Sequence, residues 1–184
     1  MKRSMRSRMS DVVCFRAVGW KSPHGDTRIP ADTGILLDSG ENASAHAKQH
    51  EIARREAGRG VTFAVLENGA FRGIVSLIGL MHTHRALTYR RAELAYWLGR
   101  PHRGRGLATE AGIAALRFGF GTLGLHKVHV GHFGVNTASR ALIERLGFRP
   151  VGIQRQEFSK DGVWHDHHLY EMLDAEFAAQ EKNR

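Results

Sequence analysis

Residues 96–111 read YWLGRPHRGRGLATEA, and this stretch decides how the chain is expected to fold. An apolar run ends at Gly99, a turn rich in glycine and arginine follows, and a run of good helix formers begins at Leu107. Glycine lets the backbone approach a ligand closely, and the free N–H groups and dipole of a helix N-terminus favour an anion. The stretch therefore predicts a strand, an anion-binding turn and a helix, with arginines whose donors suit phosphate.

The segments on both sides of this stretch predict a mixed α/β (α+β) domain. An Asn68-Gly69 pair between two apolar runs is strong hairpin chemistry, so the strand ending at Leu98 is expected to be the third of a meander. A strand, a helix and a strand in succession require a central parallel crossover in a mostly antiparallel sheet with flanking helices. The expected strands cover residues 12–15, 61–66, 71–78, 92–98, 127–130, 151–156 and 164–172, and the expected helices cover 45–57, 107–123 and 136–146. Residues 82–91 are expected to form a polar loop or strand end.

The length of 184 residues suits one domain, which we expect to cover residues 11–184 behind a disordered basic tail at 1–10. Met5 or Met9 is an alternative start. The single cysteine, Cys14, excludes an internal disulfide and a cysteine zinc cage, and it fits a reducing, cytoplasmic location. No apolar run approaches the ~20 residues that cross a bilayer, so no membrane association is expected.

The formal net charge is +9, from 27 Lys and Arg against 18 Asp and Glu. Such a charge raises the local concentration of anionic partners, although it also serves plain solubility. Basic residues interleaved with aromatic ones, which are typical of nucleic-acid binding, do not form a stripe here. Nucleic acid is therefore not the expected partner, and an RNA-associated protein is kept as a rival hypothesis.

The glycine turn by itself is not decisive. A Walker loop would continue with Gly-Lys-Ser/Thr, and a dinucleotide fingerprint would have the spacing Gly-x-Gly-x-x-Gly. Neither pattern occurs at residues 99–111, and a tight loop with solvated arginines would look the same. A second motif is needed to choose between these interpretations.

That second motif lies downstream, at Asn136-x-x-Ser139, and the two motifs together resemble a known family. Arg103-x-x-Gly106-x-Ala108 resembles the acetyl-CoA signature Gln/Arg-x-x-Gly-x-Gly/Ala of the GNAT superfamily of N-acetyltransferases. The string at 96–111, with NxxS at 136–139 and ExLGF at 144–148, is similar to the branch that contains the ribosomal-protein N-terminal (alanine/serine) acetyltransferases. The resemblance covers roughly residues 45–172. It implies the GNAT fold and transfer of acetyl from acetyl-CoA to a primary amine. We expect a monomer or homodimer.

The resemblance also implies a division of labour in binding acetyl-CoA. The end of the third strand would leave its neighbour, and its backbone would pair with the pantetheine arm and polarise the thioester carbonyl as an oxyanion hole does. Asn136 would contact the pantetheine arm, and Arg140 would reach the nucleotide end. The backbone positions implied for the pantetheine arm are Trp97, Leu98 and Gly99, and those implied for the pyrophosphate are Arg103, Gly104, Arg105, Gly106, Leu107, Ala108 and Thr109.

Three residues are candidates for the general acid and the general base of acetyl transfer. Many GNAT enzymes carry a tyrosine as the acid seven residues after the helix-opening asparagine, where this chain has Ile143. The ribosomal-protein branch instead implies that Ser139 hydrogen-bonds the departing sulfur, and the alternative role for Ser139 is to cap the helix. Glu93 is the first candidate for the general base and Glu157 the second, with a surface carboxylate as the alternative for either.

The histidines do not indicate a metal site, and the sequence allows several amine acceptors. His82 and His84, and the group His165, His167 and His168, lack convincing ligand spacing, so we expect no metal and give a histidine the role of lining the acceptor pocket. The acceptor is a protein N-terminus by resemblance, or a polyamine or aminoglycoside. A non-catalytic acyl-CoA-binding module on the same fold is the remaining rival.

Overall fold

The structure is a computed structural model, and it describes residues 60–184. The predictions for the basic tail at 1–10, the strand at 12–15, the helix at 45–57 and the domain start at residue 11 lie outside these residues.

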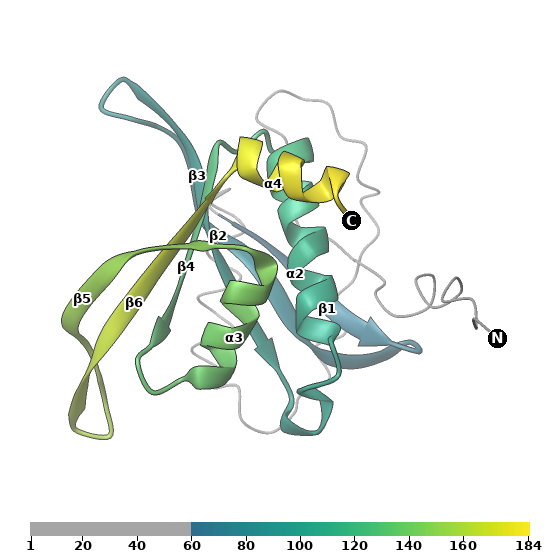
Figure 1. The fold of residues 1–184 in the computed structure, drawn as a ribbon, viewed down its shortest axis with the longest axis vertical. Coiled ribbons are helices and arrows are strands. Elements are labelled where there is room, and N and C mark those ends of the chain that lie inside the picture. Colours follow the sequence, from purple (N-terminus) through teal and green to yellow (C-terminus); the bar gives the residue numbers. More distant parts are fainter. Residues whose placement is uncertain (1–59) are drawn as a thin grey trace.

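The described residues form one six-stranded sheet with helices packed against it (Figure 1). The strand order is β1-β2-β3-β4-β6-β5, and only the β3–β4 pair is parallel. The predicted mixed sheet with a central parallel crossover is therefore confirmed. The strands are β1 (Gly60–Glu67), β2 (Ala70–His84), β3 (Leu87–Leu98), β4 (Lys127–Phe133), β5 (Arg149–Lys160) and β6 (Val163–Leu173). The helices are α2 (Leu107–Arg117), α3 (Thr137–Leu146) and α4 (Asp174–Lys182), with a 3-10 turn η1 (Arg100–His102) and a π turn η2 (Phe118–Thr122).

Local chemistry accounts for most element ends. Asn68 and Gly69 both have positive φ, 52° and 77°, which a tight hairpin turn between β1 and β2 requires. Asn136 caps α3 by accepting a hydrogen bond from the Ser139 N–H at 3.1 Å, and Gly147 ends α3 with φ of 89°. The predicted cap, stop and turn are all confirmed.

The extents of two elements differ from those expected, and one helix was not expected. Of the two alternatives for residues 82–91, the strand end is confirmed, because β2 and β3 continue as a long hairpin that turns at Arg85 and Ala86 and projects from the body (Figure 1). This extension is exposed, so its sequence shows no apolar alternation. The helix expected over 107–123 ends at Arg117 and gives way to the π turn, in which Gly119 packs directly against Leu77. Helix α4 was not expected, although Phe177 is buried and Glu176 accepts a hydrogen bond from the Leu173 N–H at 3.0 Å.

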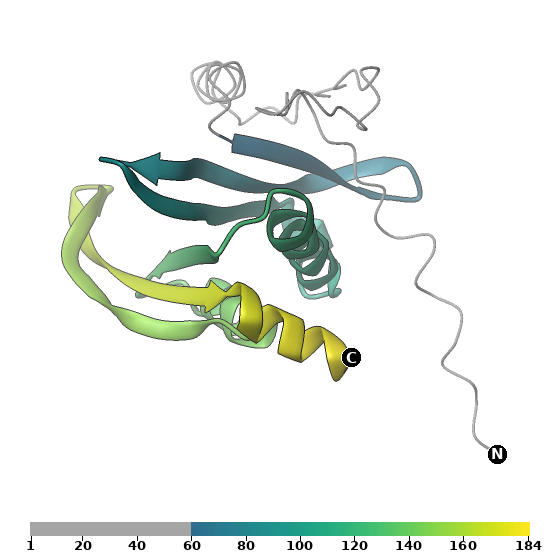
Figure 2. The ribbon, with the colours of Figure 1, turned by 90° about the horizontal axis from the view of Figure 1, so that it is seen from above.

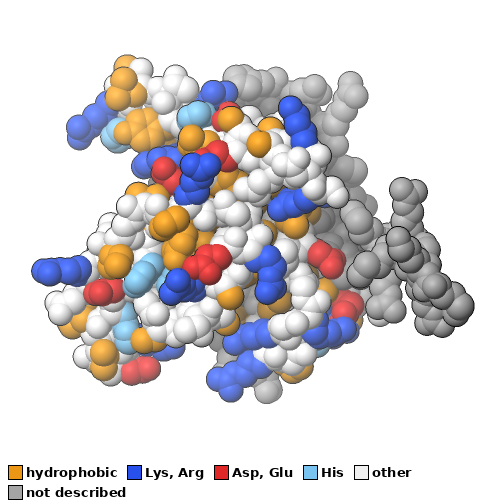
Figure 3. Space-filling view, viewed as in Figure 1, with side chains coloured by type: hydrophobic (Ala, Val, Ile, Leu, Met, Phe, Trp, Pro, Cys, Tyr) orange, Lys and Arg blue, Asp and Glu red, His pale blue; other side chains and the backbone are white. Residues whose placement is uncertain are grey.

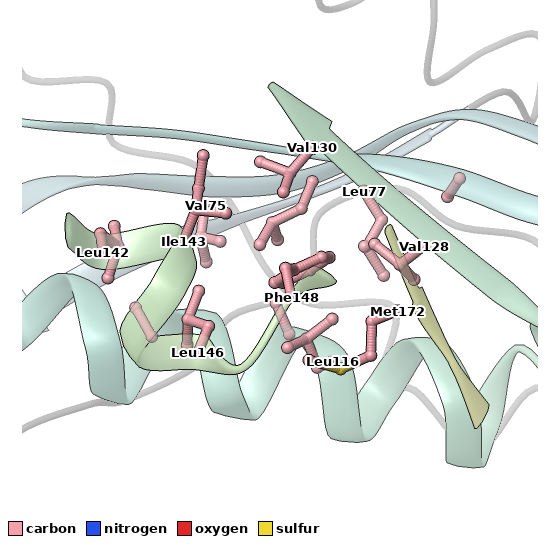
Figure 4. Packing of buried hydrophobic residues seen from close by; sticks show 14 of the residues in the cluster. Val75, Leu77, Leu116, Val128, Val130, Leu142, Ile143, Leu146, Phe148 and Met172 are labelled. Atoms are coloured by element: carbon pink, nitrogen blue, oxygen red, sulfur yellow. The ribbon is translucent and has the colours of Figure 1, made fainter. Parts of the chain in front are cut away.

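The core lies between the sheet and the α2–α3 pair (Figure 4). Figure 2 shows β1–β3 and β5–β6 diverging on either side of α2. The two helices approach closely at Gly112, where a Cβ would lie 3.0 Å from a methyl of Leu146. Along β3, Ala92 and Leu94 are buried in this core, so Glu93 between them faces the opposite side of the sheet. Among the helices of residues 60–184, none has the length and apolarity that crossing a bilayer requires.

Candidate active site

The parallel pair β3–β4 is joined over only three positions. The register pairs are Arg91 with Lys127, Ala92 with Val128, and Glu93 with His129. β4 continues to pair with β6 over its full length, to Phe133, while β3 runs on with β2 to Leu98. Within the described part of the chain, β3 and β4 therefore part after Glu93 and leave a gap in the middle of the sheet.

Strand alternation determines which backbone groups of β3 face this gap. The Gly99 N–H donates to the Arg72 carbonyl at 3.0 Å, which directs Gly99 towards β2, and the backbone of Trp97, two residues earlier, faces the same way. The groups of Tyr96 and Leu98 then face the gap, and the Leu98 carbonyl indeed accepts a hydrogen bond from Arg103 Nε at 2.9 Å. Three positions were expected to meet a pantetheine arm. The backbone of Leu98 faces the gap, whereas that of Trp97 and Gly99 faces β2. Tyr96 also faces the gap and was not among the expected positions.

The glycine turn forms an open helix N-terminus at the end of this gap. Gly106 precedes α2 with φ of 89°, and no side chain of the described residues caps the helix. The N–H groups of Thr109 and Glu110 donate to the Gly106 carbonyl at 2.9 and 3.1 Å. The N–H groups of Leu107 and Ala108 are therefore the ones that point out of the helix N-terminus. Figure 3 shows Lys and Arg side chains gathered at the end of the molecule that carries this turn. The arrangement suits an anion.

The arginines expected to hold phosphate already have partners. Besides Arg103, Arg105 makes a two-pronged ion pair with Glu67 of β1, at 2.5 and 3.1 Å, with half of its side chain exposed. Glu67 also pairs with Arg72 Nε at 3.3 Å, so its carboxylate keeps a cationic partner when Arg105 turns to a phosphate. Arg140 pairs with Glu144 at 2.8 Å, and this bond raises the pKa of the Arg140 guanidinium.

Ser139 meets a side chain that sequence reasoning had not assigned to the site. Its Oγ lies 2.6 Å from the hydroxyl of Tyr96 on β3, and its N–H is already capped by Asn136. The capping role therefore belongs to Asn136, and the Ser139 hydroxyl points to the β3 side of the gap. Burial raises the pKa of Tyr96, and the bond to Ser139 offsets part of that effect. The sequence pattern that could have identified Tyr96 is its alternation with Ala92 and Leu94, which puts all three side chains on the helix side of the sheet.

Ile143, where many GNAT enzymes carry a tyrosine, is fully buried in the core (Figure 4). It lies among apolar side chains that include Leu142 and Leu146. Its position on α3 therefore serves packing, while a phenol reaches Ser139 from β3 instead.

The opposite face of the sheet carries Glu93 and His129 beside each other. Glu93 Oε2 lies 3.9 Å from His129 Nε2, and both side chains are about two-fifths exposed. Burial lowers the pKa of His129, as do the charges of Arg91, Lys127 and His167, while a ring hydrogen bond to the Ala92 carbonyl raises it. Ser139 and Glu93 therefore flank the gap from opposite faces.

Glu157 lies farther away, on the exposed edge strand β5, two strands beyond β4. The ladder between β5 and β6 is interrupted between Gln154 and Phe158, where Gln156 has φ of 51°. Burial lowers the pKa of His167, and the charge of Glu157 offsets part of that effect. The structure therefore does not bring the two carboxylate candidates together.

The histidines fall on two faces of the sheet. His132 is buried and stacks on His168 with ring centroids 5.0 Å apart, while His167 covers Gly131 on the other face. His84 lies far from both, against Tyr89 on the long hairpin. Within residues 60–184, no three or more His, Cys, Asp or Glu side chains are arranged to hold a metal ion.

Comparisons with known proteins agree with this architecture. The curated relatives include a putative ribosomal N-acetyltransferase, YdaF, of Bacillus subtilis (strain 168), which is 30% identical over 121 residues, covering 66% of this chain and 63% of that protein. A spermidine N(1)-acetyltransferase of Escherichia coli (strain K12) is 31% identical over 102 residues, covering 55% of this chain and 52% of that protein. The chain spans about half the length of the curated relatives it matches.

A solved structure of an acetyltransferase relative has a similar fold. Mycobacterium smegmatis RimJ in complex with CoA-disulfide superposes with a TM-score of 0.61 at 27% identity, covering 74% of this chain and 69% of that one. The family model of the acetyltransferase (GNAT) domain matches residues 25–149, which is more than half of the chain. The resemblance found in the two motifs is confirmed, and relatives from the ribosomal-protein branch are among the matches. This chain belongs to the GNAT acetyltransferase family.

Proposed function

We propose that this protein transfers the acetyl group of acetyl-CoA to a primary amine by direct attack. The observation that carries the proposal is the parting of β3 and β4 immediately after the Glu93–His129 pair. Among the described residues, the gap runs along a strand edge without a pairing partner to a helix N-terminus without a side-chain cap, at Gly106. An extended thiol-bearing arm and its pyrophosphate fit these two parts. Acetyl-CoA supplies the activated acyl group, whose thioester carbon the amine attacks.

The residues of this chain hold the donor along that path. The N–H groups of Tyr96 and Leu98 face the gap and are aimed where the thioester carbonyl gains charge. The N–H groups of Leu107 and Ala108 receive the pyrophosphate, with Arg105 leaving Glu67 to join them. The other donor contacts come from residues that the motifs mark, namely Arg103, Gly104, Gly106, Thr109, Asn136 and Arg140.

The acid and the base act from opposite faces of the sheet. Glu93 takes the proton of the incoming amine on the face away from the helices, directly or through water. Ser139 donates a hydrogen bond to the departing sulfur on the helix side. Glu93 is preferred to Glu157 because it belongs to the last register pair before the gap, whereas Glu157 lies on the edge strand.

The acceptor we propose is a protein N-terminal amine. Relatives named as ribosomal-protein acetyltransferases support it, and a relative named as a spermidine acetyltransferase supports the polyamine alternative. Arg91 and Lys127 flank Glu93 and His129, and the chain carries a net charge of +9. A polycation would be repelled by this surface, while an N-terminus brings only one positive charge. The single Cys14 suits a reducing compartment, so we infer that the acetylation takes place in the cytoplasm.

An amine panel tests the proposal. Release of free thiol from acetyl-CoA is measured with peptides that begin with Ala or Ser, with spermidine and with an aminoglycoside. The expected result is a kcat/KM for at least one peptide that exceeds those for both small amines. A preference for spermidine would favour the polyamine alternative. Tight CoA binding without turnover of any amine would favour the non-catalytic acyl-CoA-binding module.

A further inference from the structure

Tyr96 and Ser139 come together from elements 43 residues apart in the chain. Tyr96 reaches from β3 and Ser139 from the first turn of α3, so the pair bridges the two elements. The hydroxyl oxygens are 2.6 Å apart, and the Tyr96 hydroxyl is 3.5 Å from the Ser139 carbonyl oxygen. Both acceptors therefore lie on the same side of the phenol.

The chemistry of the two hydroxyls decides which one donates. A phenol is more acidic than an alcohol, which makes it the better donor, and the alcohol oxygen is the better acceptor. The neighbouring Ser139 carbonyl can only accept, and its position also attracts the phenolic proton towards Ser139. Burial raises the pKa of Tyr96, so the phenol keeps its proton at neutral pH.

Once the Ser139 oxygen accepts from Tyr96, its own proton must point elsewhere. The Ser139 backbone is held by the bond from its N–H to Asn136 Oδ1, so the residue cannot swing away. A hydrogen bond accepted by a hydroxyl also polarises the bond that the hydroxyl donates. The bond from Tyr96 therefore directs the Ser139 proton and strengthens the hydrogen bond that Ser139 donates.

We propose that Tyr96 is a positioning residue that donates to Ser139 Oγ and thereby directs the Ser139 O–H at the departing sulfur. The inference rests on the proposed acetyl transfer. As the carbon–sulfur bond breaks, its electron pair stays on the sulfur, and the Ser139 O–H donates a hydrogen bond to it. The thiolate then takes a proton from water, and Glu93 returns the amine proton to water. Tyr96 itself keeps its proton throughout.

The test removes the phenolic oxygen and keeps the ring. Tyr96→Phe is expected to lower kcat about three- to tenfold, the effect of one positioned hydrogen bond, with acetyl-CoA affinity unchanged. Tyr170→Phe is the matched control, because Tyr170 is a buried tyrosine on β6 whose hydroxyl lies 3.4 Å from His132 Nε2 rather than at Ser139. The control is expected to keep the wild-type kcat.

Coupling between the two residues separates positioning from plain packing. In a Ser139→Ala background, Tyr96→Phe should cause no further loss, whereas Ser139→Thr keeps an Oγ and should remain sensitive to Tyr96→Phe. Independent, multiplicative losses would overturn the inference, as would a loss of acetyl-CoA affinity as large as the loss of kcat. An absence of turnover by the wild-type protein would overturn the proposed function itself. Wild-type turnover that is indifferent to Tyr96→Phe would overturn this inference alone.

Discussion

The carboxylate of Glu93 on β3 lies 3.9 Å from the imidazole Nε2 of His129 on β4, at the last position where the two strands pair. At this separation the groups interact through charge and not through a direct hydrogen bond. Burial and the positive neighbours Arg91 and Lys127 lower the pKa of His129, so its ring is neutral at pH 7. A neutral His129 forms no ion pair with Glu93, the residue that we propose as the general base.

Replacing Glu93 by Gln should therefore remove the base without disturbing donor binding. We expect kcat/KM for the amine to fall by about 10²–10³ at pH 7 and to recover in part as the pH rises, since the amine then loses its proton in solution. Acetyl-CoA affinity should stay at the wild-type value. Thiol release between about pH 6 and 9 measures the first effect, and calorimetric titration measures the second.

Glu157→Gln is the matched control for that variant. Glu157 is also an exposed carboxylate close to a histidine, but it lies on the edge strand. It should retain most of the wild-type activity. A larger loss from Glu157→Gln than from Glu93→Gln would transfer the role of base to the edge strand.

Gly106→Glu should abolish CoA binding. It introduces a carboxylate at the start of α2, where the pyrophosphate is proposed to bind. Because Gly106 has φ of 89°, any side chain there is strained, by about 1–2 kcal/mol. Gly106→Ala carries the same strain without the charge and should keep measurable affinity. Calorimetric titration of both variants with CoA is the measurement, and equal affinities for the two variants would refute the cradle.

Stability should fall in mild acid because of His129. Its pKa in the folded protein lies below the ordinary value of 6.5, so below that pH the unfolded chain binds a proton that the folded protein does not. The free energy of unfolding should therefore decrease as the pH falls below about 6.5 and be unaffected by this group above it. Urea unfolding at several pH values should show a shallower decrease for His129→Gln than for the wild type. His84→Gln, on the long hairpin, is the control, and an identical slope for His129→Gln would contradict the prediction.

Gly73→Ala should destabilise the sheet next to the gap. A Cβ at Gly73 would lie 2.1 Å from the Trp97 carbonyl oxygen and 2.6 Å from Leu98 Cδ2, so β2 and β3 would have to move apart. The expected loss is about 1–3 kcal/mol in the free energy of unfolding, with weaker acetyl-CoA binding because Leu98 lines the gap. At Gly152, also in a strand, a Cβ meets no atom of residues 60–184 within 4 Å, so Gly152→Ala should change the free energy of unfolding by less than about 0.5 kcal/mol. Denaturant unfolding compares the two, and equal stabilities would contradict the packing argument.

Much of the fold follows from the sequence, because its signals are local. Asn68 and Gly69 at the hairpin, Gly106 before α2, and Asn136 and Gly147 at the ends of α3 each adopt the conformation that their residue type favours. The full length of the long hairpin and helix α4 were not predicted. The first has no apolar alternation, and α4 depends on the docking of a single buried side chain, Phe177.

By itself, then, the sequence determined the order of the elements, the glycine turn and the family, since turn and cap preferences act within a few residues. Only the tertiary structure decided that β3 leaves β4 after Glu93, that Glu93 and Glu157 lie on separate strands, and that Tyr96 meets Ser139. Those relationships join residues tens of positions apart. They depend on the register of the sheet and the packing of α3 against it, and a shift of one residue in register would turn Tyr96 to the opposite face.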